Sequence, residues 1–238
     1  MSDLKVSVFP DADAAAFEAA RFIAARARRA VADRGRFTVA VSGGQTPGRM
    51  LRALAGEDVP WDSVHVLQID ERVAPGGDPD RNLTQLRESL LAHAPLAPAQ
   101  VHAMPVELND LQAAAARYAE TLKSVAGSPP VLDLAHLGLG PDGHTASLVP
   151  GDPVLDVRDA EVAITGSYQG LCRMTLTYRV LNRARQLLWL VTGAGKAAML
   201  ARLRNGDESI PAGRVCADHA VVFADRAAAA CLKPGFPG

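Results

Sequence analysis

Short apolar segments alternate with longer helix-forming segments along most of this chain, and this alternation is the strongest constraint on its fold. The apolar segments have the length of buried strands and lie at residues 5–9, 37–41, 64–69, 131–137, 186–191 and 220–223. Helices are expected between them, at residues 14–33, 47–54, 82–91, 110–125 and 193–204. Strands that alternate with helices predict an α/β fold, in which a mostly parallel sheet is covered by helices on both faces.

Local signals mark the boundaries of two of these helices. Asp13 can cap the first helix, and Gly35 can end it. Thr46 can cap the second helix, with Pro47 as its first residue.

Two regions depart from simple alternation. Strands expected at residues 161–165, 173–177 and 186–191 follow one another closely, so part of the sheet is expected to be antiparallel. The turn-rich stretch near residues 75–110 leaves room for a small inserted subdomain. We expect residues 1–238 to form a single domain.

Composition excludes several classes of partner. The net charge is −1 and the aromatic fraction is 5%, so the chain lacks the basic field and the stacking surface that nucleic-acid binding needs. No apolar run approaches a membrane span, and the first residues lack a signal-peptide pattern. Three cysteines without a CxxC pair fit a reducing compartment. We expect a cytoplasmic protein that binds neither nucleic acid nor membrane.

Four polar clusters follow expected strands, at residues 42–46, 70–72, 142–144 and 193–196. In open α/β sheets, ligands bind beyond the carboxyl ends of the strands. These clusters are therefore the candidates for chemistry.

Three of the clusters suit an anion. In Ser42-Gly43-Gly44-Gln45-Thr46-Pro47, glycines and a helix start offer free N–H groups to a phosphate, although the segment also reads as a tight turn without a ligand. Asp70-Glu71-Arg72 follows an apolar strand. Arg72 could bind a phosphate and Asp70 could bind a sugar hydroxyl. The alternative is a cluster of salt bridges at the surface. Lys196 opposes a helix dipole unless an anion lies there, and the alternative is an exposed lysine. Arg173 is a similar candidate with a weaker signal.

The remaining cluster carries a candidate base. Residues 138–143 match GxGxxG, but Pro141 lies inside the match and Pro150-Gly151 cuts off the helix that a dinucleotide site requires. The alternative is a loop in which His144 acts as general base and Asp142 fixes its tautomer. The other histidines have no metal-ligand spacing, and no GxSxG motif is present. Together the clusters describe a phosphorylated small molecule acted on by general base catalysis, without a metal or cofactor.

At these residues the chain resembles the 6-phosphogluconolactonases, within the larger group that includes the glucosamine-6-phosphate isomerases. The matching pieces are residues 42–47, 70–72, Asn82, residues 138–148 with Pro150-Gly151, Arg173 with residues 175–177, and residues 193–197. They keep the family order and cover nearly the whole chain.

The resemblance implies a Rossmann-like domain that hydrolyses a phosphorylated sugar lactone in the pentose phosphate pathway, and we expect a monomer. It implies that His144 activates water beside Asp142, while Asp70 and Asn82 lie near the sugar. It places Arg72, Arg173 and Lys196 around the phosphate, with the backbone of Gly43, Gly44, Gln45 and Thr46.

Two alternatives to a lactonase are open to a chain of this kind. Amino-sugar-phosphate isomerases of the group carry an acidic residue where this chain has Val149, and valine cannot relay a proton. A non-catalytic sugar-phosphate sensor would need a DNA-binding part, and no helix-turn-helix pattern precedes Phe37.

Two positions depart from the lactonase pattern. Residues 75–82 lack its histidine and carry Arg81 where a serine usually precedes Asn82, and Val149 replaces a phenylalanine.

Overall fold

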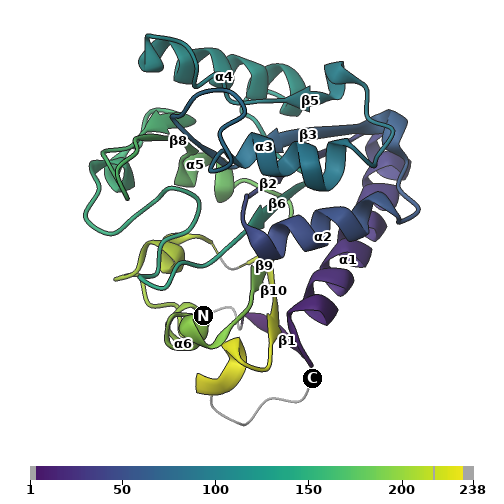
Figure 1. The fold of residues 1–238 in the computed structure, drawn as a ribbon, viewed down its shortest axis with the longest axis vertical. Coiled ribbons are helices and arrows are strands. Elements are labelled where there is room, and N and C mark those ends of the chain that lie inside the picture. The colour runs from purple at the N-terminus through teal and green to yellow at the C-terminus, as the bar shows by residue number, and fades with distance from the viewer. Residues whose placement is uncertain (1–3, 217, 233–238) are drawn as a thin grey trace.

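A computed structural model of the chain describes residues 4–216 and 218–232. Within them, a seven-stranded sheet has the strand order β1-β10-β9-β6-β2-β3-β5, and every neighbouring pair is parallel. Its strands are β1 (Lys5–Phe9), β2 (Phe37–Val41), β3 (Val64–Gln68), β5 (Val101–His102), β6 (Leu134–Leu137), β9 (Leu187–Val191) and β10 (Ala220–Asp225). The expected α/β fold with a mostly parallel sheet is confirmed (Figure 1).

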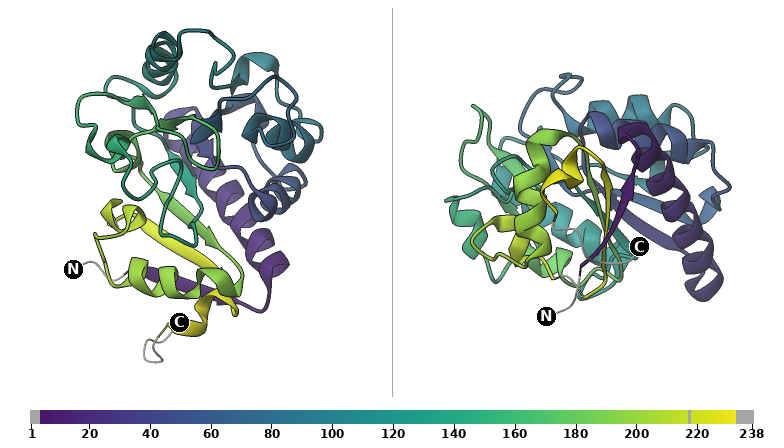
Figure 2. Two further views of the ribbon diagram at one scale, coloured as in Figure 1. Left: turned by 60° about the vertical axis from the view of Figure 1, so that its left-hand side comes forward. Right: turned by 90° about the horizontal axis from the view of Figure 1, so that it is seen from below.

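Helices cover both faces of this sheet because its inner strands are apolar on both sides. The helices are α1 (Ala12–Arg34), α2 (Gln45–Ala55), α3 (Asn82–Leu86), α4 (Leu111–Ala126), α5 (Tyr178–Leu181) and α6 (Ala197–Arg204). One core holds side chains of α1, α2 and α3, and the other holds side chains of α4, α5 and α6. Figure 2 shows α1 and α6 on opposite sides of β9 and β10. No helix in the described part of the chain is both long and apolar enough to cross a membrane.

Two helices each start two residues before the expected position. Asp11, not Asp13, caps α1, because its extended backbone lets the carboxylate accept from Ala14 N at 2.8 Å. Helix α2 starts at Gln45 after Gly44, which has φ 119°, a conformation that favours glycine. Thr46 therefore lies inside the first turn and is not the cap.

A second, antiparallel sheet was only partly expected. It has the order β4-β8-β7, where β4 is Asp70–Arg72, β7 is Val162–Ile164 and β8 is Arg173–Leu176. Strands at 161–165 and 173–177 were predicted, but residues 70–72 were not expected to leave the first sheet and pair with β8. The two-residue strand β5 and the one-turn helix α5 were also not predicted.

The buried carboxylate of Glu71 holds β4 against the start of α3. Glu71 is 0% exposed and accepts from the backbone N–H groups of Arg72, Asn82 and Leu83 at 2.8–2.9 Å. Arg81 is 1% exposed, and its Nε lies 3.1 Å from Glu71 Oε2 while its Nη1 lies 2.5 Å from Glu107 Oε1. The arginine that departs from the family pattern is thus the counter-ion of a buried carboxylate.

A buried histidine lies in the middle of the parallel sheet. His136 of β6 is 0% exposed, and its Nδ1 accepts from Ser42 N at 3.4 Å. The proton is therefore on Nε2, which has no hydrogen-bond partner among the described residues. Burial lowers the pKa of His136 to about 4.

The ion pair of Arg81 predicts a stability loss. Arg81→Met should lower the free energy of unfolding by about 3–5 kcal/mol, because it leaves the buried charge of Glu71 without its counter-ion. Urea unfolding measures this, with Lys123→Met as the matched control. Lys123 and Glu120 form an exposed pair, which contributes about 0–1 kcal/mol. Equal losses in the two variants would show that Glu71 does not need Arg81.

His136 predicts a loss of stability in acid. Between the ordinary histidine pKa of 6.5 and the folded value of about 4, the unfolded chain binds a proton that the folded chain does not. The free energy of unfolding should therefore fall as pH drops through this window, by about 3 kcal/mol in total from this residue. Urea unfolding at several pH values should show a smaller fall in His136→Asn, whose amide oxygen can still accept from Ser42. An unchanged fall would assign the acid sensitivity to other groups.

Candidate active site

The four polar clusters meet in one cavity of about 270 Å³ at the carboxyl ends of β2, β6 and β9. Its lining contains nearly every predicted site residue, namely Gly43, Gly44, Gln45, Thr46, Asp70, Arg72, Asn82, His144, Arg173 and Lys196. Asp142 lies behind His144 and is not among the lining residues. Carboxyl ends of parallel strands lie at one edge of a sheet, which is why segments far apart in sequence converge here.

The candidate base is held by its neighbour in the same loop. His144 Nδ1 lies 2.6 Å from Asp142 Oδ1, and the His144 backbone N–H donates to the same oxygen at 3.2 Å. Burial alone would raise the pKa of Asp142, but these hydrogen bonds, the nearby imidazole and the Tyr168 hydroxyl together lower it below its ordinary value. The carboxylate thus stays ionised and fixes the proton on Nδ1, which leaves Nε2 to accept a proton.

Gly140 is required by the closeness of this pair. A Cβ at Gly140 would lie 2.1 Å from His144 Nδ1 and 2.6 Å from Asp142 Oδ1. The glycines of the 138–143 motif therefore make room for an Asp–His pair, and no long helix follows them for a dinucleotide.

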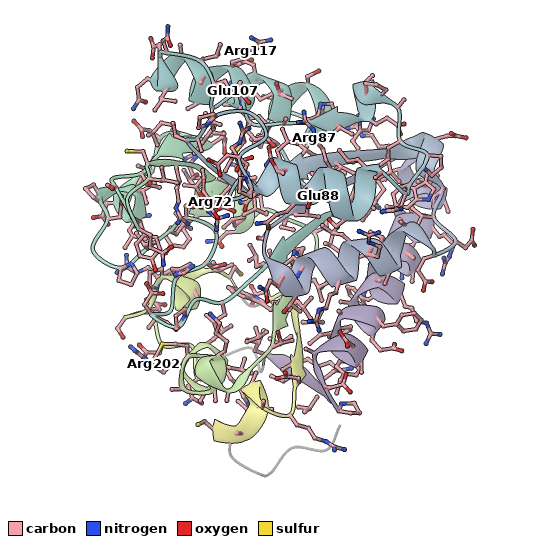
Figure 3. The ribbon with its side chains drawn as sticks, in the orientation of Figure 1. Arg72, Arg87, Glu88, Glu107, Arg117 and Arg202 are labelled. Atoms are coloured by element: carbon pink, nitrogen blue, oxygen red, sulfur yellow. The ribbon has the colours of Figure 1, made fainter. Side chains whose placement is uncertain are left out.

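Two of the predicted cations lie directly opposite each other. Arg72 of β4 pairs with Arg173 of β8 in the antiparallel register. Like charges in this position repel, so a bound anion between them would offset the cost. In Figure 3, Arg72 lies near the centre of the molecule, whereas Arg202 lies far below it beside α6.

Each of these arginines is held from one side. Arg72 Nη1 donates to Asn82 Oδ1 at 3.2 Å and to the Asp80 carbonyl. Arg173 is 5% exposed; its Nη2 donates to Gln169 Oε1 at 3.3 Å, and its buried Nε has no partner among the described residues. Burial lowers the pKa of Arg173, and the nearby Asp70 carboxylate acts in the opposite direction.

Lys196 supplies the third cation from the loop after β9. It lines the cavity and makes no hydrogen bond or ion pair with any residue that the structure describes. Partial burial lowers its pKa, and the nearby Asp142 carboxylate acts in the opposite direction. Such an ammonium group is available to a ligand anion.

The glycine loop faces the cavity with its backbone. A Cβ at Gly43 would lie 2.1 Å from Asn82 Oδ1, so only glycine fits between β2 and α3. Helix α2 has no side-chain cap, which leaves the N–H groups of Gln45 and Thr46 at its start free to bind an anion. The Thr46 hydroxyl lies 2.7 Å from the Thr192 hydroxyl, which ties this loop to the loop after β9.

Asp70 and Asn82 form the polar wall beside the arginines. Asp70 Oδ2 accepts from Ser147 Oγ at 2.6 Å, and Asn82 Nδ2 donates to the Asp70 carbonyl at 2.9 Å. Burial raises the pKa of Asp70, and the hydrogen bond from Ser147 with the charges of Arg173 and Arg72 partly offsets this. Ser147 is thus a buried loop residue whose hydroxyl is bonded to Asp70.

Sequence reasoning missed Tyr168, whose hydroxyl donates to Asp142 Oδ2 at 3.1 Å. Its ring also contacts His144 and Arg173. The only available signal was Gln169-Gly170 between two expected strands, a dipeptide suited to a tight hairpin.

Among the described residues, no three or more His, Cys, Asp or Glu side chains gather in a way that could hold a metal ion.

Comparisons with known proteins agree with this arrangement. A family profile described as glucosamine-6-phosphate isomerases/6-phosphogluconolactonase matches residues 10–224. The chain is 36% identical to a 6-phosphogluconolactonase of Nostoc sp., over 83% of this chain and 84% of the relative. It is also 36% identical to a 6-phosphogluconolactonase of Mycobacterium tuberculosis, over 95% and 98%.

A solved structure gives the same result for the fold. The 6-phosphogluconolactonase of Thermotoga maritima superimposes with a TM-score of 0.83 at 26% identity, covering 93% of this chain and 99% of that one. The chain therefore belongs to the glucosamine-6-phosphate isomerase/6-phosphogluconolactonase family.

Proposed function

We propose that the chain hydrolyses 6-phospho-D-glucono-1,5-lactone to 6-phosphogluconate, the lactone-opening step of the oxidative pentose phosphate pathway. The observation that carries this proposal is the His144–Asp142 pair in the same cavity as Arg72, Arg173 and Lys196. The base suits activation of water, and the three cations suit a phosphate. The relatives from Nostoc sp. and Mycobacterium tuberculosis, which match over most of their length, are named 6-phosphogluconolactonases.

In the proposed reaction, the phosphate binds to the cations and to the free N–H groups at the start of α2, and so anchors the sugar. His144 Nε2 then takes a proton from water as the water oxygen attacks the lactone carbonyl carbon. The tetrahedral intermediate collapses with cleavage of the bond to the ring oxygen, which receives the proton from the imidazolium. The balance needs only lactone and water, so the proposed reaction consumes no co-reactant.

The isomerase alternative is less well supported. Val149 is buried and has no group that could relay a proton to His144. The sensor alternative needs a DNA-binding part, but the described residues before Phe37 form β1 and α1, and α1 packs on the sheet.

Loss of the base should remove most of the catalysis. His144→Ala is expected to lower kcat by roughly 10²–10⁴-fold with little change in KM. Lactone is generated fresh, and the spontaneous hydrolysis rate is subtracted. The control is His93→Ala, since His93 is exposed and does not line the cavity. Full turnover in His144→Ala would remove His144 from the mechanism.

Loss of a phosphate cation should instead weaken substrate binding. Lys196→Met is expected to raise KM by about 10–100-fold, the loss of one charge-assisted contact, and to leave kcat within about a few-fold. Unphosphorylated glucono-1,5-lactone should be hydrolysed equally by both proteins, because it has no phosphate for Lys196 to bind. Lys123→Met on α4 serves as the matched loss of charge. An unchanged KM would place the phosphate elsewhere.

A further inference from the structure

We propose that Tyr168 is a positioning residue for the reaction: its hydroxyl holds the Asp142 carboxylate that orients His144, and its ring supports Arg173. The inference rests on the proposed lactonase function and adds a residue that links the base to the phosphate site.

The first link is a chain of two hydrogen bonds. Tyr168 Oη donates to Asp142 Oδ2 at 3.1 Å, while the other carboxylate oxygen lies 2.6 Å from His144 Nδ1. The edge-to-face contact between the Tyr168 and His144 rings, with centroids 5.5 Å apart at 68°, restrains the imidazole directly. Tyr168 thus contacts both members of the pair.

The second link runs to the phosphate site. Arg173 Cζ lies 5.0 Å from the centre of the Tyr168 ring, within the range of a cation–π contact. Gln169, the next residue, accepts from Arg173 Nη2 at 3.3 Å. Together these contacts hold the buried guanidinium from the side of the hairpin tip.

The hairpin between β7 and β8 fixes the place of Tyr168. Tyr168 N donates to Leu171 O at 3.0 Å across a two-residue turn. Gln169 and Gly170 have φ angles of 55° and 85°, the positive values that a type I′ hairpin turn requires. Further down, Thr165 N donates to Arg173 O at 2.9 Å, and Arg173 N donates to the Thr165 hydroxyl at 3.1 Å. Tyr168 therefore reaches the active site from a closed turn.

The chemistry requires Tyr168 to remain a donor. Burial and the adjacent Asp142 carboxylate raise the pKa of Tyr168, so its hydroxyl keeps its proton over the working range. The donated hydrogen bond draws negative charge on Asp142 away from His144. Other charged groups face this cluster: Lys196 lies near Asp142, and Arg173 lies near Tyr168, with Asp70 and Arg72 beyond it. Among the described residues, none of these groups donates a hydrogen bond to Asp142, and Tyr168 is the side chain outside the 138–148 loop that does so.

The test is Tyr168→Phe, which removes the hydroxyl and keeps the ring. Without the Tyr168 hydroxyl, more of the negative charge of Asp142 faces the imidazole and favours its protonated form. As the pH falls, His144 should therefore become protonated, and stop acting as a base, at a higher pH than in the wild type. The midpoint of the acid limb of kcat/KM is expected to move up by about 0.5 pH unit, which lowers the rate about threefold below the midpoint. KM on the plateau should stay near the wild-type value.

Two further variants separate this role from a structural one. Tyr168→Leu also removes the ring beneath Arg173, so it should raise KM several-fold over Tyr168→Phe. Tyr178→Phe removes a tyrosine hydroxyl that donates to the Pro211 carbonyl at 2.9 Å, away from the cavity, and should leave the pH profile unchanged.

A second readout does not depend on turnover. The proton NMR signal of the His144 ring, assigned by its absence in His144→Ala, should titrate at higher pH in Tyr168→Phe than in the wild type. If the wild type does not hydrolyse the lactone, the proposed function fails, while this titration still tests the link from Tyr168 to His144. If the wild type is active and Tyr168→Phe keeps both midpoints, the positioning role is overturned. A shifted NMR midpoint with an unchanged rate profile would also overturn it.

Discussion

The hydrogen bonds and ion pair of the buried Glu71 carboxylate hold the edge of the cavity that β4 and the start of α3 form. An ionised group without solvent is tolerated only when it is paired and fully hydrogen-bonded. Glu71 meets this condition through three backbone N–H groups, the Gln68 side chain at 2.9 Å and the guanidinium of Arg81. These donors come from the end of β3, from β4 and from the start of α3. One carboxylate therefore fixes the positions of Arg72 and Asn82, so that both side chains line the cavity.

The second sheet gives this edge an electrostatic cost that the nearby Asp70 carboxylate offsets only in part. Arg72 and Arg173 are cross-strand partners, and the buried Nε of Arg173 has no hydrogen-bond partner within the part of the chain that the structure describes. Repulsion between the two guanidinium groups and the burial of Arg173 both cost free energy. In the proposed function, a substrate phosphate offsets both costs. Part of the binding free energy would thus come from relief of the repulsion between the two arginines.

Sequence reasoning succeeded where local pattern and sheet geometry decide the outcome. Apolar runs located the strands, and the carboxyl-end rule predicted that residues 42–46, 142–144 and 193–196 would meet. It failed where pairing between distant segments decides. Residues 70–72 form a strand only because β8 lies beside them. Gln169-Gly170 marks a hairpin turn, but no local signal shows that this hairpin brings Tyr168 to Asp142. From the sequence, Arg81 is only a departure from the lactonase pattern. Its partner Glu71 lies ten residues away, and the burial of both side chains depends on tertiary packing.

The contact between the two sheets sets the distance from the proposed phosphate site to the proposed base. Arg72 and Arg173 belong to the antiparallel sheet, whereas the loop of His144 follows β6 of the parallel sheet. Buried hydrogen bonds cross this contact, from Ser147 Oγ to Asp70 Oδ2 at 2.6 Å and from Ser147 N to the Thr175 hydroxyl at 3.3 Å. Leu176 N also donates to Ile69 O at 2.9 Å. In a substrate anchored by its phosphate, the carbonyl lies at a fixed distance from that phosphate. A shift of one sheet against the other would therefore separate the carbonyl from His144, even if the arginines and His144 each kept their local structure. On this reasoning Ser147 matters to the proposed reaction because its hydrogen bonds hold the two sheets together.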